Sequence, residues 1–489
     1  MDTAPLLLDP AICDRARLAR DPRFDGRFFI GVLTTGIYCR PICPAPSPKK
    51  SNIRYFPSAA AAAEAGLRPC LRCRPEAAPG TPAWAGTSAT VRRALRLIHE
   101  GALDTGSVDQ LAARLGVGAR HLHRLFVQHV GASPIVVAQT RRLHFAKRLI
   151  DDTTLPMTSI ALASGFGSLR RFNAAFQGTY GRAPRALRRE RRASHCVHDD
   201  GLSLRLAYRP PYDWNTLHAF LATRAMPGVE RITDRSYART IHVNGASGWM
   251  EIRPIKAADA LELRVHGLDP SALFGVVSRV RQMFDLSADP VDVRAVLRSD
   301  ALLAPLLRAR PGLRVCGAWD PFELAVRAVL GQQISVAAAR TFAVRLVTAY
   351  GQPVTAAEGL THLFPEPAHL AAADLSVIGL TRARAATIRS LAAAVRDGVI
   401  RFDTGTTQEQ LRISLLDIHG IGAWTAEYIA MRGLGDPDAF PAEDLILRRM
   451  AGNGQVLTAA ALRKRSEAWR PWRAYAVMHL WRAAPQSGN

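Results

Sequence analysis

The sequence predicts a multidomain α+β protein with a small four-cysteine domain, an all-α domain, a small α+β domain and a larger all-α domain. Its 489 residues exceed the roughly 250 to 300 at which a single hydrophobic core stops growing. Four of its seven cysteines lie within 35 residues. Strand-like alternation is concentrated in one stretch, and helical periodicity dominates elsewhere. We expect domain boundaries at residues 1–80, 88–192, 200–290 and 291–489.

Positive charge is concentrated near the start of the chain. Residues 1–195 hold 30 Lys and Arg against 13 Asp and Glu, a net +17, whereas residues 196–489 carry a net +6. Cationic side chains on a phosphate backbone release condensed counterions, so this asymmetry favours nucleic acid as the partner. A bias toward arginine codons would also raise the count. The sequence shows neither a membrane-spanning apolar stretch nor a signal-peptide pattern, and we expect a cytoplasmic protein without membrane contact.

Four cysteines have the spacing of a metal site. Cys39 and Cys43 are separated by three residues, and Cys70 and Cys73 follow as a Cys-x2-Cys pair. Four thiolates at such spacings suit one tetrahedral Zn²⁺, and a purely structural zinc is the commoner use of such a set. The unit ends at PEAAPGTPAWAGTSAT, whose composition is typical of a linker.

The residues around these cysteines, TTGIYCRPIC, NIRYF and GLRPCLRCRPE, resemble the N-terminal zinc domain of Ada-type DNA alkylation-repair proteins over about residues 10–78. The resemblance implies that Cys39 irreversibly accepts a methyl group from a methylphosphotriester in DNA. Zinc keeps a bound sulfur as thiolate, so no general base is needed. Methylation would reduce the formal charge of a four-thiolate zinc site from −2 to −1, and each molecule would record one damage event.

A weak internal repeat at an offset of 49 to 50 residues pairs LAARLGVGARHLHRLFVQHVGASP with IALASGFGSLRRFNAAFQGTYGRAP. Each copy reads as helix, tight turn at Gly116 or Gly165, and second helix, which is the helix-turn-helix pattern. Residues 90–190 resemble the DNA-binding domain of AraC-family transcription activators, which implies promoter DNA and RNA polymerase as partners. In that family the second helix of each unit enters the major groove. The candidate base readers, some of which could instead contact phosphate or solvent, are Arg120, His121, His123, Arg124, Ser168, Leu169, Arg170, Arg171 and Asn173.

The stretch from residue 202 to 290 alternates apolar and polar residues in segments such as LSLRLAYRP, ARTIHVNG, GWMEIRPIK and LELRVHG. This period of two predicts strands, and amphipathic helices are expected around residues 214–225 and 271–286. From about residue 291 onward the pattern is almost wholly helical.

The string LLDIHGIGAWTAEYIAMRGLGDPDAFPAEDLIL places Gly420 and Gly422 in a hairpin between two helical patterns. Such glycines let backbone N–H groups approach a phosphate, often with a bridging monovalent cation. The full string resembles the helix-hairpin-helix glycosylase superfamily. The strings LRLAYRPPYDWNTLHAFLATRAMPGVE, LGQQISVAAA and WRPWRAYAVMHLW narrow the resemblance to the AlkA type, 3-methyladenine DNA glycosylase II, over about residues 203–485.

The resemblance assigns the catalytic carboxylate to Asp444, with its neighbour Glu443 as the competitor. It also assigns the aromatic base pocket to Trp424, Tyr428 and Trp481, although core packing commonly explains such aromatics. Electron-rich faces suit 3-methyladenine and 7-methylguanine, whose nucleosides are cationic.

The family inserts a wedge side chain after LGQ when a base is extruded, and here that place holds Gln333 in place of an aliphatic residue. The position of the Schiff-base lysine of bifunctional relatives holds Trp424, so we expect no lyase activity. With Cys316 as the single cysteine of this unit, the iron–sulfur cluster of some relatives is not expected. The Pro-Cys-His-Arg motif of O6-methylguanine repair has no match.

We therefore expect a bacterial, nucleoid-associated fusion of damage sensor, transcription activator and monofunctional glycosylase. The alternative is a regulator whose glycosylase unit is degenerate and only binds DNA.

Overall fold

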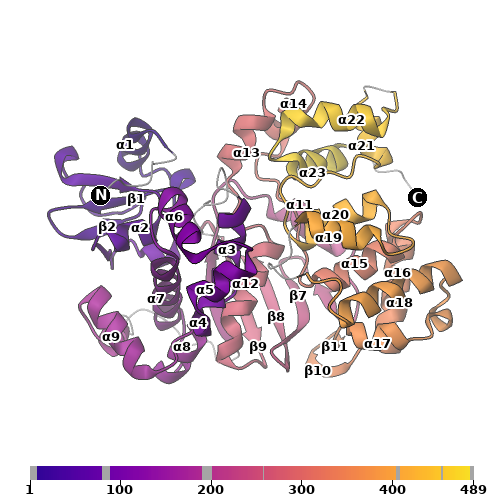
Figure 1. Cartoon of the computed structure of the whole chain (residues 1–489), viewed down its shortest axis with the longest axis horizontal. Coiled ribbons are helices and arrows are strands. Elements are labelled where there is room, and N and C mark those ends of the chain that lie inside the picture. Colours follow the sequence, from indigo (N-terminus) through magenta and orange to yellow (C-terminus); the bar gives the residue numbers. More distant parts are fainter. Residues whose placement is uncertain are drawn as a thin grey trace. The chain divides into compact units, whose positions relative to one another are not determined.

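The computed structural model describes residues 8–79, 89–189, 201–256, 258–402, 408–452 and 455–484. They form two compact units, Met1–Pro210 with Ile255–Ser278 and Pro211–Pro254 with Arg279–Asn489 (Figure 1). Cys196 lies outside the described part, as do residues 80–88 of the expected linker at residues 75–90. The ends of that stretch are not linker, because Pro75–Ala77 form a 3-10 turn with Glu76 buried and helix α3 (Ala89–His99) begins at Ala89. Within that part, no helix has the length and apolar character needed to cross a membrane.

The elements of the first unit begin and end as follows: α1 (Pro10–Leu18), β1 (Phe29–Val32), β2 (Ile37–Cys39), β3 (Ile53–Phe56), α2 (Ala59–Glu64), β4 (Arg68–Pro69), α3 (Ala89–His99), α4 (Ala102–Thr105), α5 (Val108–Arg114), α6 (Ala119–Val130), α7 (Pro134–Asp152), α8 (Met157–Ala163), α9 (Leu169–Tyr180), α10 (Pro184–Arg189), β5 (Leu202–Ala207) and β9 (Ala260–His266).

The cysteine-rich part is a four-stranded sheet of order β3-β1-β2-β4. Strands β2 and β4 are parallel, and Tyr38 is opposite Pro69. The next residue along the chain from each is a cysteine, and the Cys70 backbone N–H donates to the Tyr38 carbonyl at 3.0 Å, which brings Cys39 beside Cys70. Tyr38 is buried in a small core with Phe29, Phe56 and three alanines of α2, namely Ala59, Ala61 and Ala62.

The repeat predicted from the sequence is present as two helix-turn-helix units, α5–α6 and α8–α9. Gly116 and Gly165 both have positive φ, +70° and +79°, a conformation that glycine adopts without steric cost. Ser107 and Gln110 form a capping box at the start of α5. Helix α7 connects the two units and begins with Ser133 as its N-cap.

The elements of the second unit, together with α12, which spans the division, begin and end as follows: α11 (Trp214–Ala222), β6 (Glu230–Ile232), β7 (Tyr237–Val243), β8 (Ala246–Pro254), α12 (Leu273–Met283), α13 (Pro290–Leu297), α14 (Leu303–Ala309), α15 (Pro321–Leu330), α16 (Val336–Tyr350), β10 (Pro353–Ala357), β11 (Leu360–His362), α17 (Pro367–Ala372), α18 (Arg382–Arg396), α19 (Gln408–Leu416), α20 (Ala423–Gly433), α21 (Leu445–Met450), α22 (Ala459–Ser466) and α23 (Arg473–Ala483).

The strands and helices expected between residues 202 and 290 are present, and β6 is an additional short strand. Among the described residues after 291, the expected helical pattern is interrupted by the hairpin β10–β11. This hairpin is held by tertiary contacts that a local pattern does not show. Thr361 and His362 donate backbone hydrogen bonds to the Gly228 carbonyl, and Thr240 donates its hydroxyl to the His362 carbonyl, at 2.7 Å.

Two hydrophobic clusters fill the helical part of this unit, one built mainly around α15, α16 and α18 and the other around α13, α14 and α23. Tyr428, on α20, packs against both clusters. The face of α20 at their junction is therefore fixed from two sides.

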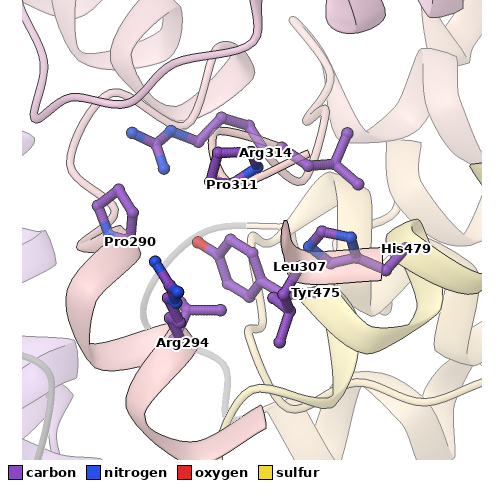
Figure 2. A pocket seen from close by; sticks show the side chains of 9 residues that line it. Pro290, Arg294, Leu307, Pro311, Arg314, Tyr475 and His479 are labelled. Atoms are coloured by element: carbon purple, nitrogen blue, oxygen red, sulfur yellow. The ribbon is translucent and has the colours of Figure 1, made fainter. Parts of the chain in front are cut away.

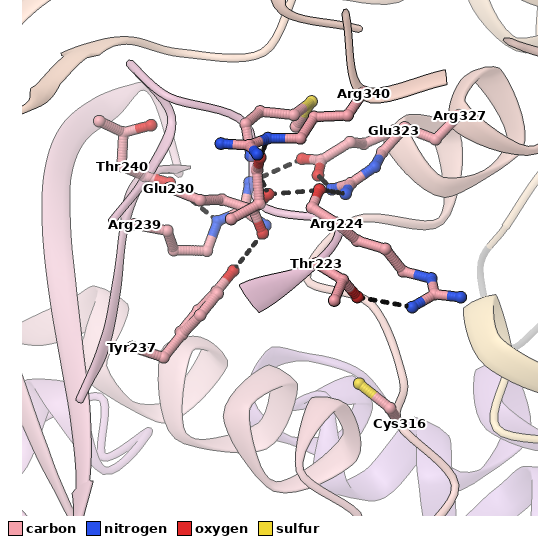
Figure 3. A network of polar contacts seen from close by, with 12 residues as sticks. Thr223, Arg224, Glu230, Tyr237, Arg239, Thr240, Cys316, Glu323, Arg327 and Arg340 are labelled. Atoms are coloured by element: carbon pink, nitrogen blue, oxygen red, sulfur yellow. Dashed lines mark hydrogen bonds and ion pairs between the residues drawn. The ribbon is translucent and has the colours of Figure 1, made fainter. Parts of the chain in front are cut away.

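A buried charge network ties the strands of the second unit to α15 (Figure 3). Glu323 accepts from Arg239 at 2.6 Å and from Arg327 at 3.0 Å. Glu230 accepts from Arg327 at 3.1 Å and from the Tyr237 hydroxyl at 2.6 Å. Buried charges are tolerated when they are paired in this way, and the pairing fixes the helix that leads to Gln333.

Candidate functional sites

The Sγ atoms of Cys39, Cys43, Cys70 and Cys73 all lie within 4.8 Å of one another. Tetrahedral zinc with Zn–S bonds of ~2.3 Å requires S···S separations of about 3.8 Å, so the four sulfurs fit the ion. The site binds one zinc through four cysteines.

Arg40, which follows Cys39 in the chain, forms hydrogen bonds to another zinc ligand. Arg40 donates its backbone N–H to Cys73 Sγ at 3.3 Å and its side chain to the Cys73 carbonyl at 3.0 Å. Arg40 is in turn ion-paired with Asp25. Sequence reasoning missed both residues, although Arg40 directly follows a ligand. Cys70 and Cys73 are buried, whereas Cys39 and Cys43 are partly exposed.

Two cysteines outside this cluster, Cys13 and Cys316, are buried. Burial raises the pKa of Cys13 to about 11 and also raises the pKa of Cys316. Both thiols are therefore protonated at neutral pH and poorly nucleophilic.

The nine candidate base readers lie at the start of α6 and at the start of α9, and all are exposed. Ser168 is the N-cap of α9 and accepts from the Arg171 backbone N–H at 3.2 Å. His121 and Arg124 are bonded to each other at 3.0 Å. Leu122 and Phe126 on α6, and Phe172 and Phe176 on α9, are fully buried and form the core behind these faces.

The hairpin glycines lie between α19 and α20. Gly420 has φ +92°, and a Cβ there would lie 2.2 Å from Thr387 Oγ1. Thr387 donates to the His419 carbonyl at 2.9 Å, and Gln332 donates to the Gly420 carbonyl at 2.9 Å. Gly422 is the N-cap of α20, so the backbone N–H groups of the first turn lie next to the hairpin.

Asp444 is the N-cap of α21 and is 9% exposed. Its Oδ1 accepts from the Leu447 backbone N–H at 2.9 Å, and its Oδ2 accepts from Trp424 Nε1 at 2.8 Å. Glu443 instead forms an ion pair with Arg463, whose side chain is exposed. The carboxylate that contacts the aromatic residues is therefore that of Asp444.

The three predicted aromatics are half-buried and adjacent. Trp424 and Tyr428 stack at 5.1 Å between ring centroids with an interplanar angle of 11°. Tyr428 and Trp481 are 6.2 Å apart and tilted. Trp424 therefore stacks on Tyr428 and also donates a hydrogen bond to the Asp444 carboxylate.

Sequence reasoning missed the cations behind this stack. Arg432 bonds to the Tyr428 hydroxyl and donates to the Cys316 carbonyl at 2.7 Å. Phe220 lies 3.9 Å from the guanidinium of Arg224 and 4.7 Å from that of Arg432. Burial raises the pKa of Tyr428, but the guanidinium groups of Arg432 and Arg224 outweigh this effect, and the pKa is lower than usual. The spacing of Tyr428 and Arg432, one helical turn apart, could have indicated the first contact.

Gln333 lies in the short turn between α15 and α16. It is exposed and has φ +57°, a left-handed conformation that costs a residue other than glycine roughly 1–2 kcal/mol. The neighbouring Gln332 is bonded to Gly420, so the turn and the hairpin are connected.

A separate cavity is lined by residues of α13, α14 and α23, among them Arg294, Tyr475 and His479 (Figure 2). Burial, assisted by Arg310, lowers the pKa of His479 to about 4. None of the predicted site residues lines this cavity.

Four family descriptions match successive parts of the chain. They are "Metal binding domain of Ada" (residues 12–76), "Helix-turn-helix domain" (111–190), "AlkA N-terminal domain" (203–320) and "HhH-GPD superfamily base excision DNA repair protein" (326–473). The fold and its sites define a DNA repair protein that also carries a zinc unit and a transcription-factor type of DNA-binding domain.

One similar protein is the "Probable bifunctional transcriptional activator/DNA repair enzyme AlkA" of Mycobacterium tuberculosis (strain CDC 1551 / Oshkosh). It is 43% identical over 474 residues, which cover 96% of this chain and 95% of the relative. The chain belongs to this family of bifunctional transcriptional activator/DNA repair enzymes.

Partial relatives agree with this assignment. "DNA-3-methyladenine glycosylase 2" of Escherichia coli (strain K12) is 37% identical and covers 56% of this chain and 95% of its own length. A solved 3-methyladenine DNA glycosylase from Archaeoglobus fulgidus covers 57% of this chain and 96% of its own, with 22% identity and a TM-score of 0.50, and shows the shared fold.

Proposed function

We propose that the second unit is a monofunctional DNA glycosylase that excises alkylated bases such as 3-methyladenine and 7-methylguanine. The observation that carries this proposal is the geometry of Asp444, whose carboxylate is fixed by two hydrogen bonds next to a pair of stacked aromatic rings. The extruded base enters beside Trp424. Gln333 fills the space that the base leaves in the duplex.

In this mechanism Asp444 stabilises the positive charge that develops on the sugar as the glycosidic bond breaks. The Leu447 N–H and the Trp424 indole N–H hold its oxygens in place, so little reorganisation is needed. The methylated base already carries positive charge and is a good leaving group. Water completes the hydrolysis, and the absence of lysine from the hairpin leaves the strand intact.

For the first unit, we propose single-turnover methyl transfer from a DNA methylphosphotriester to Cys39. Bound zinc holds the sulfur as thiolate at neutral pH. An S–CH₃ bond forms, the CH₃–O bond breaks, and the phosphodiester anion leaves with the electron pair. Exposure favours Cys39 and Cys43 over the buried ligands, and the family resemblance selects Cys39.

The methylated protein then binds promoter DNA through α6 and α9, with Arg120, His123, Arg124, Arg170, Arg171 and Asn173 as candidate contacts, and recruits RNA polymerase. Gly420 and Gly422 contact a phosphate near the damaged base. We also propose that a monovalent cation binds at this hairpin and that the protein associates with the nucleoid.

One experiment tests both activities. The full chain is incubated with duplex DNA methylated to give base and phosphotriester lesions, and released bases and protein-bound methyl are scored together. We expect both signals. Methyl transfer without base release would favour the alternative in which the second unit only binds DNA, and base release without methyl transfer would refute the sensor.

A further inference from the structure

Helix α7, which connects the two helix-turn-helix units, presents one face to the zinc unit. His144, Lys147, Arg148, Asp151 and Asp152 follow the spacing i, i+3, i+4, i+7 and i+8, which places them on one side of a helix. Each of them has a contact with a residue of the zinc unit.

Two of these contacts come from residues adjacent to zinc ligands. The Tyr38 hydroxyl, next to Cys39 in the chain, lies 2.9 Å from His144 Nε2. The guanidinium of Arg74, next to Cys73, lies 2.7 Å from Asp151 Oδ2 and 3.3 Å from Asp152 Oδ1. Each of the two cysteine pairs therefore has a chain neighbour that contacts α7 directly.

Glu76 completes the contact. Lys147 Nζ is 2.7 Å from Asp151 Oδ2 and 3.6 Å from Glu76 Oε1, and these three side chains are 0–4% exposed. Arg148 donates to the Glu76 carbonyl at 2.6 Å. With Arg74 and Asp152 the cluster has three acidic and three basic groups, so it is neutral overall. A neutral, buried cluster is screened little by salt.

The zinc unit also touches both recognition helices. Ser58 donates its hydroxyl to the carbonyl of Val130, the last residue of α6, at 3.0 Å. Glu64 accepts from the backbone N–H of Ser133, the N-cap of α7, at 3.1 Å. Strand β4 contacts α9.

We propose that the zinc unit and the helix-turn-helix pair form one rigid DNA-reading body, docked through α7, and that Arg74 is a positioning residue for the methylation response. This inference rests on the proposed function, because it concerns how methylation of Cys39 changes promoter binding.

The physical reason is tethering. On a flexible tether, a negatively charged zinc site would swing away from DNA and oppose promoter binding only weakly. Docked on α7, the site keeps a fixed position relative to the phosphates that α6 and α9 approach. The loss of one negative charge at Cys39 then lowers the repulsion between the zinc site and the phosphates of the bound promoter, without any change of shape.

The test compares Arg74→Gln with Arg72→Gln in the full chain. Arg72 directly precedes Cys73, which Arg74 directly follows, and Arg72 is exposed. Both changes therefore remove one positive charge next to the same zinc ligand. For each protein, the promoter dissociation constant is measured before and after methylation of Cys39, together with the rate of methyl transfer and the zinc content.

We expect the ratio of the two dissociation constants to fall at least threefold in Arg74→Gln and to stay near the wild-type value in Arg72→Gln. Arg74→Lys, which keeps the charge, should restore most of the ratio. Methyl transfer should stay within about twofold of wild type in all three. An unchanged ratio in Arg74→Gln with intact methyl transfer would overturn the inference, whereas no transfer in the wild type would refute the proposed function instead.

A second measurement covers the case in which Arg74→Gln fails to bind zinc. Amide hydrogen exchange of residues 142–152 is followed in the wild type with Cys39 unmethylated and methylated. A rigid body predicts the same protection in both states, and a loss of protection on methylation would overturn it.

Discussion

The zinc site and the Asp444 site both place a negatively charged group at the end of a secondary-structure element, and they protect it differently. Cys39 ends β2 and is partly exposed, and its sulfur lies within 4.8 Å of three other cysteine sulfurs. Asp444 begins α21 and is nearly buried, with each oxygen held by one N–H donor.

The difference fits the two kinds of chemistry that we propose. A nucleophile that is used once needs access and a neighbourhood that registers its change of charge. A carboxylate that acts at every turnover needs a position that does not change between turnovers, because the field it supplies must be organised before the bond breaks. Four experiments test this contrast, and their expected effects decrease from the first to the last.

The largest effect is expected for Cys39→Ala, which should accept no methyl group. Cys13→Ala and Cys316→Ala should keep full acceptance, since burial raises the pKa of both thiols, and Cys196→Ala should do the same. Mass spectrometry of peptides after reaction with methylated DNA locates the methyl. Its appearance on any other cysteine would contradict the assignment.

Asp444→Asn should lower base release ~10² to 10³-fold while methyl transfer to Cys39 continues, because the amide cannot stabilise the cationic sugar. Glu443→Gln is the matched control and should stay near the wild-type rate, since its carboxylate pairs with Arg463. Release of 3-methyladenine and 7-methylguanine is measured with and without alkali. Activity that survives in Asp444→Asn would remove this residue from the mechanism, and nicking without alkali would end the monofunctional interpretation.

Gln333→Gly should reduce base release from duplex DNA about tenfold, because extruding a paired base costs a few kcal/mol and the wedge offsets part of that cost. Glycine suits the left-handed backbone at this position, with φ +57°, so the fold should be retained. Release from single-stranded DNA serves as the control and should change little. An equal loss on both substrates would argue against a wedge.

The smallest effect is expected for methylation itself. The methylated protein should bind promoter DNA several-fold more tightly at low ionic strength, because one negative charge facing phosphate is lost. The advantage should shrink as salt screens exposed charges. Filter-binding or fluorescence titrations over a range of salt concentrations measure it, and equal affinities at low salt would contradict the charge argument.

The sequence was sufficient for features that depend on local spacing. The glycine turns at Gly116 and Gly165 and the four zinc ligands follow from short motifs. The adjacency of Trp424 and Tyr428 follows from one turn of a helix. Asp444 required a family resemblance, because nothing local distinguishes it from Glu443.

Contacts between distant segments could not be predicted. The bond from Trp424 to Asp444 spans 20 residues, and the ion pair of Arg74 with Asp151 spans 77 residues of the chain. Each depends on how whole elements pack. The hairpin β10–β11 was missed for the same reason, since its carbonyl at His362 is bonded to Thr240.

The buried charge network limits which fragments of this protein can fold on their own. Glu323 and Arg327 belong to α15, but their partners Arg239 and Glu230 belong to strands that a fragment starting at residue 291 would lack. Removing one partner of a buried ion pair costs ~3–5 kcal/mol. Such a fragment should be insoluble or proteolytically labile, whereas one starting near residue 203 retains every member of the network. The smallest piece that a gene fusion could transfer intact therefore includes the strands as well as the helices.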